Sequence, residues 1–100
     1  MEKRKAHYAL EAVKAIVIRD EMLSFTRIAR RGANAMGLDD ARALAVVGAL
    51  SPFMLFKSMT THADSTVWQD VYHAPCPNGK MAYIKVTLQE GAVVIQFKEV

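Results

Sequence analysis

The chain has 100 residues, of which 52% are hydrophobic and 23% are charged, and its net charge is +3 at neutral pH. This length accommodates one small domain with one core, and the composition is typical of a folded protein and excludes a disordered one. No apolar run approaches the ~20 residues of a membrane-spanning helix, and no apolar segment of a secretion signal follows the basic N-terminus. The single cysteine, Cys76, excludes an internal disulfide, so we expect a cytoplasmic protein.

The first half of the chain has the periodicity of amphipathic helices. It predicts one helix after Tyr8, a second that runs from a cap residue to a glycine, and a third that ends before a proline. The boundary residues are Ser24 or Thr26 and Gly37 for the second helix, and Asp39 and Ser51-Pro52 for the third. The apolar stripe of the second helix is Phe25, Ile28, Ala29, Ala33 and Met36. The segment 18–23 holds either a short strand or a turn.

Beyond Pro52 the chain becomes rich in β-branched and aromatic residues, with turn signals at regular intervals. This pattern predicts four strands, at about residues 53–61, 66–74, 81–88 and 92–98. They are connected by a loop at 62–65, a loop at 75–80 with an Asn78-Gly79 turn, and a Glu90-Gly91 turn. The expected fold class is α+β, a single domain over residues 1–100 in which N-terminal helices pack on a C-terminal antiparallel β-sheet meander.

The last hairpin predicts which side chains share a face of the sheet. If Glu90 and Gly91 form a two-residue loop, the register of the two strands is fixed. One face then carries apolar pairs suited to packing on helices, namely Ile84–Phe97, Val86–Ile95 and Leu88–Val93. The other face carries the polar pairs Tyr83–Lys98 and Lys85–Gln96. The sequence therefore predicts a solvent-facing sheet surface with a phenol and two ammonium groups.

The first hairpin leaves its register open, because both of its faces mix apolar and polar residues. A loop of odd length around His62–Asp64 would set Lys57 opposite Gln69 on one face, whereas a loop of even length would separate them across the sheet. The prolines of the 75–80 loop also leave the pairing of the second and third strands open. Periodicity alone therefore does not say whether Lys57 and Gln69 join the polar surface of the last hairpin.

No short motif of phosphate-binding, dinucleotide-binding or serine-hydrolase chemistry is present. Four residues that could suggest a metal site are His62, Asp64, His73 and Cys76. They lack the paired spacing of zinc ligands, so turn and surface roles are favoured. Cys76 is also disfavoured as a nucleophile, because it lies between prolines with no evident orienting partner. We therefore expect no metal and no other cofactor.

Two aromatic residues, Trp68 and Tyr72, lie on one face of the second predicted strand. Aromatic residues in strands most often belong to the core, and this interpretation is favoured. The alternative is that they stack on unpaired bases, as aromatic residues of RNA-binding sheets do. The positive net charge is compatible with RNA, since basic side chains displace counterions condensed on phosphates, but by itself it does not select RNA.

The run Phe56–Tyr72, with the sequence FKSMTTHADSTVWQDVY, closely resembles the signature of the MqsR toxins. These are messenger-RNA-cutting toxins of bacterial toxin–antitoxin systems. Met1–Arg4 with His7, the Gly37–Asp39 junction and the closing Phe97–Glu99 are similar to the family as well. The resemblance covers nearly the whole chain, and a run of this length is far more specific than any short catalytic pattern.

The resemblance implies a fold like that of the RelE-type ribonucleases, in which a sheet is packed with helices. The family's active-site lysine, glutamine and tyrosine fall on Lys57, Gln69 and Tyr83, the expected catalytic residues. Substrate contacts are expected from Met59, Trp68, Tyr72, His73, Lys85, Gln96 and Lys98, the last of which matches a C-terminal lysine of the family. Two departures stand out: His73 replaces the family's usual arginine, and the loop before Tyr83 is one residue longer.

The implied reaction is metal-independent cleavage of mRNA at GCU-like triplets. RNA is cut when its 2′-hydroxyl attacks the adjacent phosphorus in line, so an enzyme holds that geometry, stabilises phosphoryl charge and moves protons. Lys57 and Lys98 suit the phosphate charge. Gln69 suits a hydroxyl or a base edge, and Tyr83 suits proton donation. Lysine and tyrosine side chains have unperturbed pKa values of about 10, so neither type is a ready general base at neutral pH. The base stays open, and His73 would serve only if it faces the site.

The resemblance also implies a protein partner, a cognate MqsA-like antitoxin that is itself a zinc-containing, DNA-binding protein. We expect no membrane association, and no DNA binding by this chain alone, because no helix-turn-helix pattern stands out. Two other functions stay open. One is a non-catalytic RNA- or ribosome-binding module with salt-dependent affinity, and the other is an interaction protein that offers a sheet edge or a helix groove.

Overall fold

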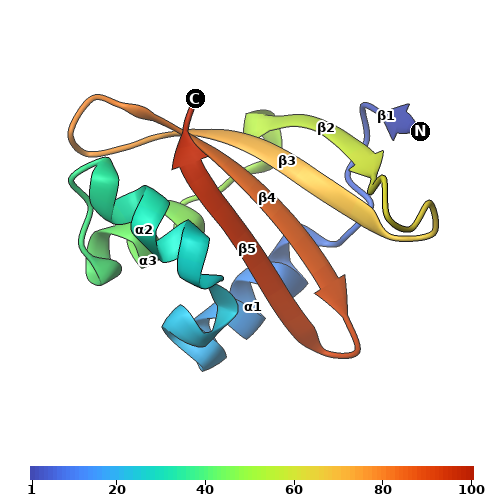
Figure 1. Ribbon diagram of the computed structural model, residues 1–100, viewed down its shortest axis with the longest axis horizontal. Coiled ribbons are helices and arrows are strands. Elements are labelled where there is room, and N and C mark those ends of the chain that lie inside the picture. The colour runs from blue at the N-terminus through green and yellow to red at the C-terminus, as the bar shows by residue number, and fades with distance from the viewer.

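A computed structural model describes residues 1–100 as three α-helices packed against a five-stranded antiparallel sheet (Figure 1). The helices are α1 (Leu10–Asp20), α2 (Arg27–Ala35) and α3 (Asp40–Gly48). The strands are β1 (Glu2–Lys3), β2 (Leu55–Thr60), β3 (Trp68–Pro75), β4 (Met81–Gln89) and β5 (Ala92–Glu99). The predicted α+β class, with helices before an antiparallel meander, is confirmed.

Capping side chains fix the starts of α2 and α3. The Thr26 hydroxyl accepts a hydrogen bond from the Ala29 amide at 3.0 Å, and the Asp39 carboxylate accepts one from the Arg42 amide at 2.8 Å. Both predicted caps are therefore confirmed. The segment 18–23 contains no strand, because α1 continues to residue 20 and a 3-10 turn follows at Glu21–Ser24.

The strands lie in the sheet in chain order, from β1 at one edge to β5 at the other (Figure 1). Both loop residues of the last hairpin have positive φ, 51° at Glu90 and 74° at Gly91, as a two-residue turn that matches the strand twist requires. The register predicted from this turn is confirmed, including the pairs Tyr83–Lys98 and Lys85–Gln96. One face of β4 and β5 is consequently apolar and the other is polar.

The edge strand β1 was not predicted from the sequence, because two residues are too few to show an alternating pattern. Glu2 pairs with Met59 and Lys3 pairs with Ser58. The N-terminus therefore adds a fifth strand to the predicted meander and lies alongside β2.

The core fills the space between the helices and one face of the sheet, here called the inner face. The strands contribute Tyr72, Ala74, Ala82, Ile84, Val86, Val93, Ile95 and Phe97 to it, and α1 contributes Val13 and Val17. The opposite face of the sheet, here called the outer face, carries the residues that alternate with these. No helix combines the length and the apolar character needed to cross a bilayer.

Candidate active site on the outer face of the sheet

The antiparallel register arranges the outer-face side chains in three neighbouring rows across the strands. The first row is Glu2, Met59 and Gln69; the second is Lys57, Val71, Lys85 and Gln96; the third is His73, Tyr83 and Lys98. Side chains that face each other on adjacent strands have Cβ atoms about 5 Å apart, so each row is a line of neighbours. The rows include every predicted site residue except Trp68 and Tyr72.

The register between β2 and β3 places Lys57 and Gln69 on the same face, as a loop of odd length requires. They do not face each other directly, because Lys57 is opposite Val71 and Gln69 is opposite Met59. The direct pairing considered from the sequence is therefore wrong by two residues, and the two side chains are diagonal neighbours. A β-bulge at Phe56 interrupts the pairing just before Lys57, and bulges of this kind re-aim side chains next to active sites.

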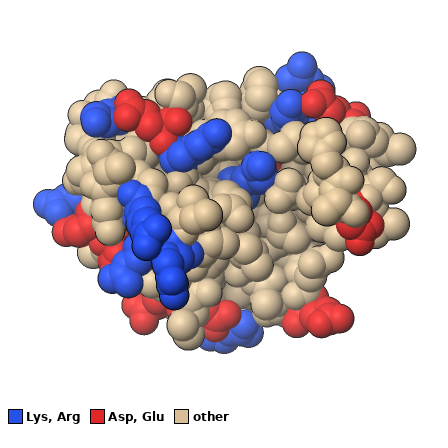
Figure 2. Space-filling model, viewed as in Figure 1, with Lys and Arg blue, Asp and Glu red and all other residues tan.

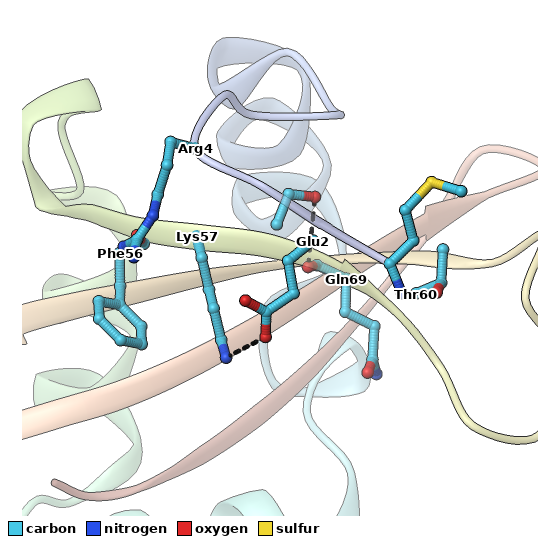
Figure 3. A network of polar contacts seen from close by, with 8 residues as sticks. Glu2, Arg4, Phe56, Lys57, Thr60 and Gln69 are labelled. Carbon is cyan, nitrogen blue, oxygen red and sulfur yellow. Dashed lines mark hydrogen bonds and ion pairs between the residues drawn. The ribbon is translucent and has the colours of Figure 1, made fainter.

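A carboxylate from the N-terminal strand holds the Lys57 ammonium. Lys57 Nζ donates to Glu2 Oε1 at 2.7 Å, and Figure 3 shows the two side chains meeting on the side of the sheet to which Gln69 also points. The Lys57 side chain is 22% exposed and that of Glu2 is 57% exposed, so both are accessible from solvent. The hydrogen bond and the charge of Lys57 hold the pKa of the Glu2 carboxyl below its usual value, so Glu2 is ionised at neutral pH.

The third row contains two neighbouring rings with a cation at its end, and the ring of Phe56 stacks on the first of them. The rings of Phe56 and His73 lie nearly parallel with centroids 4.4 Å apart, and those of His73 and Tyr83 are 5.6 Å apart. Lys98 Nζ lies 5.1 Å from the centre of the Tyr83 ring, within the range of a cation–π contact. His73, whose direction the sequence left open, therefore faces the candidate site beside Tyr83.

Two predicted substrate contacts, Trp68 and Tyr72, lie on the other side of the sheet. Tyr72 is 2% exposed in the core, and burial together with the charge of Asp70 raises its pKa to about 12. The core interpretation of Tyr72 is thus the observed one, and its predicted contact with RNA is wrong. Trp68 is half-buried under the N-terminal segment, where its ring stacks on His7 at 5.2 Å and lies 4.1 Å from Lys3 Nζ. Neither residue belongs to the candidate site.

A buried carboxylate ties the N-terminal segment to β3. Asp70 is 1% exposed and accepts hydrogen bonds from the backbone amides of His7 at 3.0 Å and Tyr8 at 2.9 Å. It also accepts one from the Ser58 hydroxyl at 2.6 Å. A buried carboxylate needs several donors of this kind to offset the loss of water. Asp70 therefore fixes the chain segment that brings Glu2 to β2.

Replacing Asp70 by alanine should lower the free energy of unfolding by about 2 kcal/mol, because two amides and a hydroxyl lose their buried acceptor. Urea denaturation measures this change. Asp40→Ala is the matched control, since Asp40 forms a partly exposed ion pair with Arg30, whose loss should cost less than about 1 kcal/mol. Equal losses in the two variants would contradict the anchoring role of Asp70.

Basic groups outnumber acidic ones among the strand residues of the outer face. The cations are Lys57, Lys85 and Lys98, and the one carboxylate is Glu2. Figure 2 shows the molecule in the orientation of Figure 1. Basic side chains gather in the middle of this face and on the side of α2, whereas most acidic side chains lie towards the rim. This distribution favours the approach of polyanions such as RNA. No three His, Cys, Asp or Glu side chains meet in a way that could hold a metal ion.

Comparison with known proteins places the chain among toxins. A family model described as "Motility quorum-sensing regulator, toxin of MqsA" matches residues 5–99. A relative from Escherichia coli (strain K12), named "mRNA interferase toxin MqsR", is 38% identical over 99 residues, which is 99% of either chain. The chain therefore belongs to the MqsR toxin family, which confirms the predicted resemblance. The enzyme class expected from the sequence, an endoribonuclease, is also the class that the relative's name gives.

The sequence did not point to Glu2 or Phe56 as parts of the site. Phe56 is the first residue of the run that resembles the family signature, but the β-bulge is what turns its ring towards His73. Glu2 lies within the N-terminal residues that resemble the family, and its contact with Lys57 depends on β1, a strand of two residues. One signal was available: Glu2 is an isolated acidic residue in an otherwise basic N-terminus, and its charge is opposite to that of Lys57.

Proposed function

We propose that this chain is an endoribonuclease toxin that cleaves messenger RNA in the cytoplasm by attack of a 2′-hydroxyl on the adjacent phosphate. The observation that carries the proposal is that one basic face presents the family's expected lysine, glutamine, tyrosine and second lysine together, as Lys57, Gln69, Tyr83 and Lys98. Family membership and the name of the Escherichia coli relative support mRNA as the substrate. The whole chain forms the single ribonuclease domain.

Each side chain has a role that suits its chemistry. The ammonium groups of Lys57 and Lys98 stabilise the charge that develops on the phosphoryl oxygens. Gln69 orients the attacking hydroxyl or a base edge through its amide, and Tyr83 donates a proton to the leaving 5′ oxygen. The proposed flanking contacts to substrate are Met59, His73, Lys85 and Gln96, which occupy the same three rows.

Incubation of a defined single-stranded RNA with the purified protein should produce discrete fragments, and excess EDTA should leave their yield unchanged. The physical reason is that the proposed roles need only side-chain ammonium, amide and phenol groups. Gel electrophoresis of the RNA is the measurement. Loss of cleavage in EDTA would contradict the metal-independent reaction. RNA that is bound but left intact, with an affinity that falls as salt rises, would instead favour the non-catalytic binding module.

The proposal also covers the RNA sequence that is cut and the protein partner of the chain. The family resemblance supports cuts at GCU-like triplets, and mapping of the fragment ends tests this; ends spread over unrelated triplets would contradict it. The family description pairs its toxins with MqsA, which supports an MqsA-like antitoxin as the partner of this chain.

A further inference from the structure

We propose that Glu2 is the general base of the cleavage reaction, and that its carboxylate takes the proton of the attacking 2′-hydroxyl while Lys57 holds the phosphate beside it. The inference rests on the endoribonuclease function proposed above and assigns the proton acceptor, a role for which the outer face offers two candidates, Glu2 and His73. Lysine and tyrosine side chains are protonated at neutral pH, and an amide is not a base, so Lys57, Gln69 and Tyr83 do not fill this role. His73 lies in the third row beside Tyr83, the proposed proton donor. Glu2 instead lies in the first row with Gln69, which orients the attacking hydroxyl.

The position of Glu2 suits a proton acceptor. It is the one carboxylate among the strand residues of the outer face, and its Oε1 lies 2.7 Å from Lys57 Nζ. Figure 3 shows Glu2, Lys57 and Gln69 pointing to the same side of the sheet from β1, β2 and β3. A hydroxyl oriented by the Gln69 amide would lie next to the carboxylate, and its phosphate would lie next to the ammonium.

The N-terminal segment is built to hold Glu2 in this place. The Met1 ammonium donates to the Thr60 hydroxyl at 3.2 Å, and the Thr60 amide donates to the Met1 carbonyl at 3.0 Å. The Arg4 guanidinium donates to the Phe56 carbonyl at 3.2 Å on the other side. Together with the hydrogen bonds from the His7 and Tyr8 amides to Asp70, these contacts hold the chain on both sides of Glu2. A side chain held in this way loses little freedom when it acts on substrate.

The order of the rows matches an in-line displacement. Glu2 belongs to the first row, Lys57 to the second and Tyr83 to the third. In-line attack puts the entering and leaving oxygens on opposite sides of phosphorus, so the base and the acid must flank the group that stabilises the phosphoryl charge. The three side chains stand in that order across the outer face.

The proton and electron balance of the step is complete with these groups. The 2′-hydroxyl gives its proton to the Glu2 carboxylate as its oxygen forms a bond to phosphorus. The bond from phosphorus to the 5′ oxygen breaks, and the electron pair leaves with that oxygen, which takes the Tyr83 phenolic proton. The products are a 2′,3′-cyclic phosphate and a free 5′-hydroxyl. Glu2 then loses its proton to water and Tyr83 regains one from water.

The groups that face Glu2 keep its carboxyl group ionised, which is the form that can accept a proton. These are the Lys57 ammonium, the Arg4 guanidinium and the N-terminal ammonium, and the hydrogen bond and charge of Lys57 contribute most to the lowered pKa of the carboxyl. The charged form therefore persists to pH values below the ordinary carboxyl range. The wild-type rate should consequently not depend on this group between about pH 5 and pH 8, and should fall at lower pH as the carboxylate is protonated.

The test is the rate of RNA cleavage by Glu2→Gln under single-turnover conditions, with any purification tag at the C-terminus. The amide oxygen of glutamine can still accept the hydrogen bond of Lys57, so the variant removes the base and keeps the contact. We expect a fall of about 100-fold with little change in RNA affinity. Its rate should also rise about tenfold per pH unit from pH 5 to pH 8, because hydroxide replaces the missing base. Formate added to Glu2→Ala should restore part of the rate.

Glu11→Gln is the matched control, since Glu11 is an exposed residue of α1, and it should keep the wild-type rate. A Glu2→Gln rate equal to or above that of the wild type would overturn the proposal. So would a reduced rate with an unchanged pH profile and no rescue by formate, because Glu2 would then only position Lys57. These results presuppose a wild-type protein that cuts RNA; if it does not cut RNA, the endoribonuclease function fails, and this inference fails with it.

Discussion

Replacement of Lys57 by methionine should lower the single-turnover rate of RNA cleavage by about 1000-fold, because a positioned cation at the phosphoryl oxygens is lost from the transition state. Methionine keeps most of the length and apolar volume of the lysine stem. The Glu2 carboxylate that loses its partner is 57% exposed, so water can solvate it. The far-UV circular dichroism and the urea midpoint should therefore stay close to those of the wild type.

Lys80→Met is the matched control for this experiment. Lys80 lies in the exposed loop between β3 and β4, at 3.8 Å from Glu99, and belongs to none of the three rows. The control removes the same charge and should keep the wild-type cleavage rate. A Lys57→Met rate within a few-fold of the wild type would show that the proposed site is wrong, and equal losses in both variants would point to overall charge instead.

Replacement of Gly32 by alanine should destabilise the protein by about 3 kcal/mol. Gly32 lies inside α2, where alanine normally favours the helix by about 1 kcal/mol. Here a Cβ atom would lie 2.1 Å from the Phe97 carbonyl oxygen and 3.4 Å from Lys98 Cα. Since both atoms belong to the backbone of β5, either the strand or the helix must move. Urea or thermal denaturation measures the effect.

Gly48→Ala is the matched control, because Gly48 ends α3 and a Cβ there meets nothing within 4 Å. Its unfolding midpoint should be unchanged or slightly raised. If Gly32→Ala were as stable as Gly48→Ala, α2 would not pack on β5 as closely as the 2.1 Å distance to the Phe97 carbonyl oxygen requires. The clash at Gly32 also links stability to the site, because a shift of β5 displaces Lys98 relative to Tyr83.

The sequence predicts those parts of the fold that depend on local signals. The helix caps at Thr26 and Asp39 are set by side chains that bond to amides three residues away. The Glu90-Gly91 turn likewise fixes the pairing of β4 with β5, and with it the polar pairs of the outer face. A short turn leaves the chain little choice of register, so half of the site follows from a few consecutive residues.

The remaining features depend on contacts between distant parts of the chain, which periodicity does not report. The pairing of Glu2 with Lys57 needs β1, which Asp70 holds in place from β3. The predicted apolar stripe of α2 is also wrong at Ile28, which is 74% exposed instead of packed in the core. The reason is that α2 approaches β5 through its smallest residues, including Gly32, so the face that carries the larger side chain turns outward.

If the substrate's own 2′-hydroxyl attacks the phosphate on the outer face, removal of that one hydroxyl from the RNA must abolish the cut. An oligonucleotide with a single 2′-deoxy sugar on the 5′ side of the mapped cut is compared with its all-ribose counterpart, and the fragment ends are identified by mass spectrometry. We expect no cut at the modified position and a 2′,3′-cyclic phosphate on the all-ribose product. Cleavage of the deoxy substrate at the ribose rate, with 3′-hydroxyl and 5′-phosphate ends, would contradict attack by the 2′-hydroxyl.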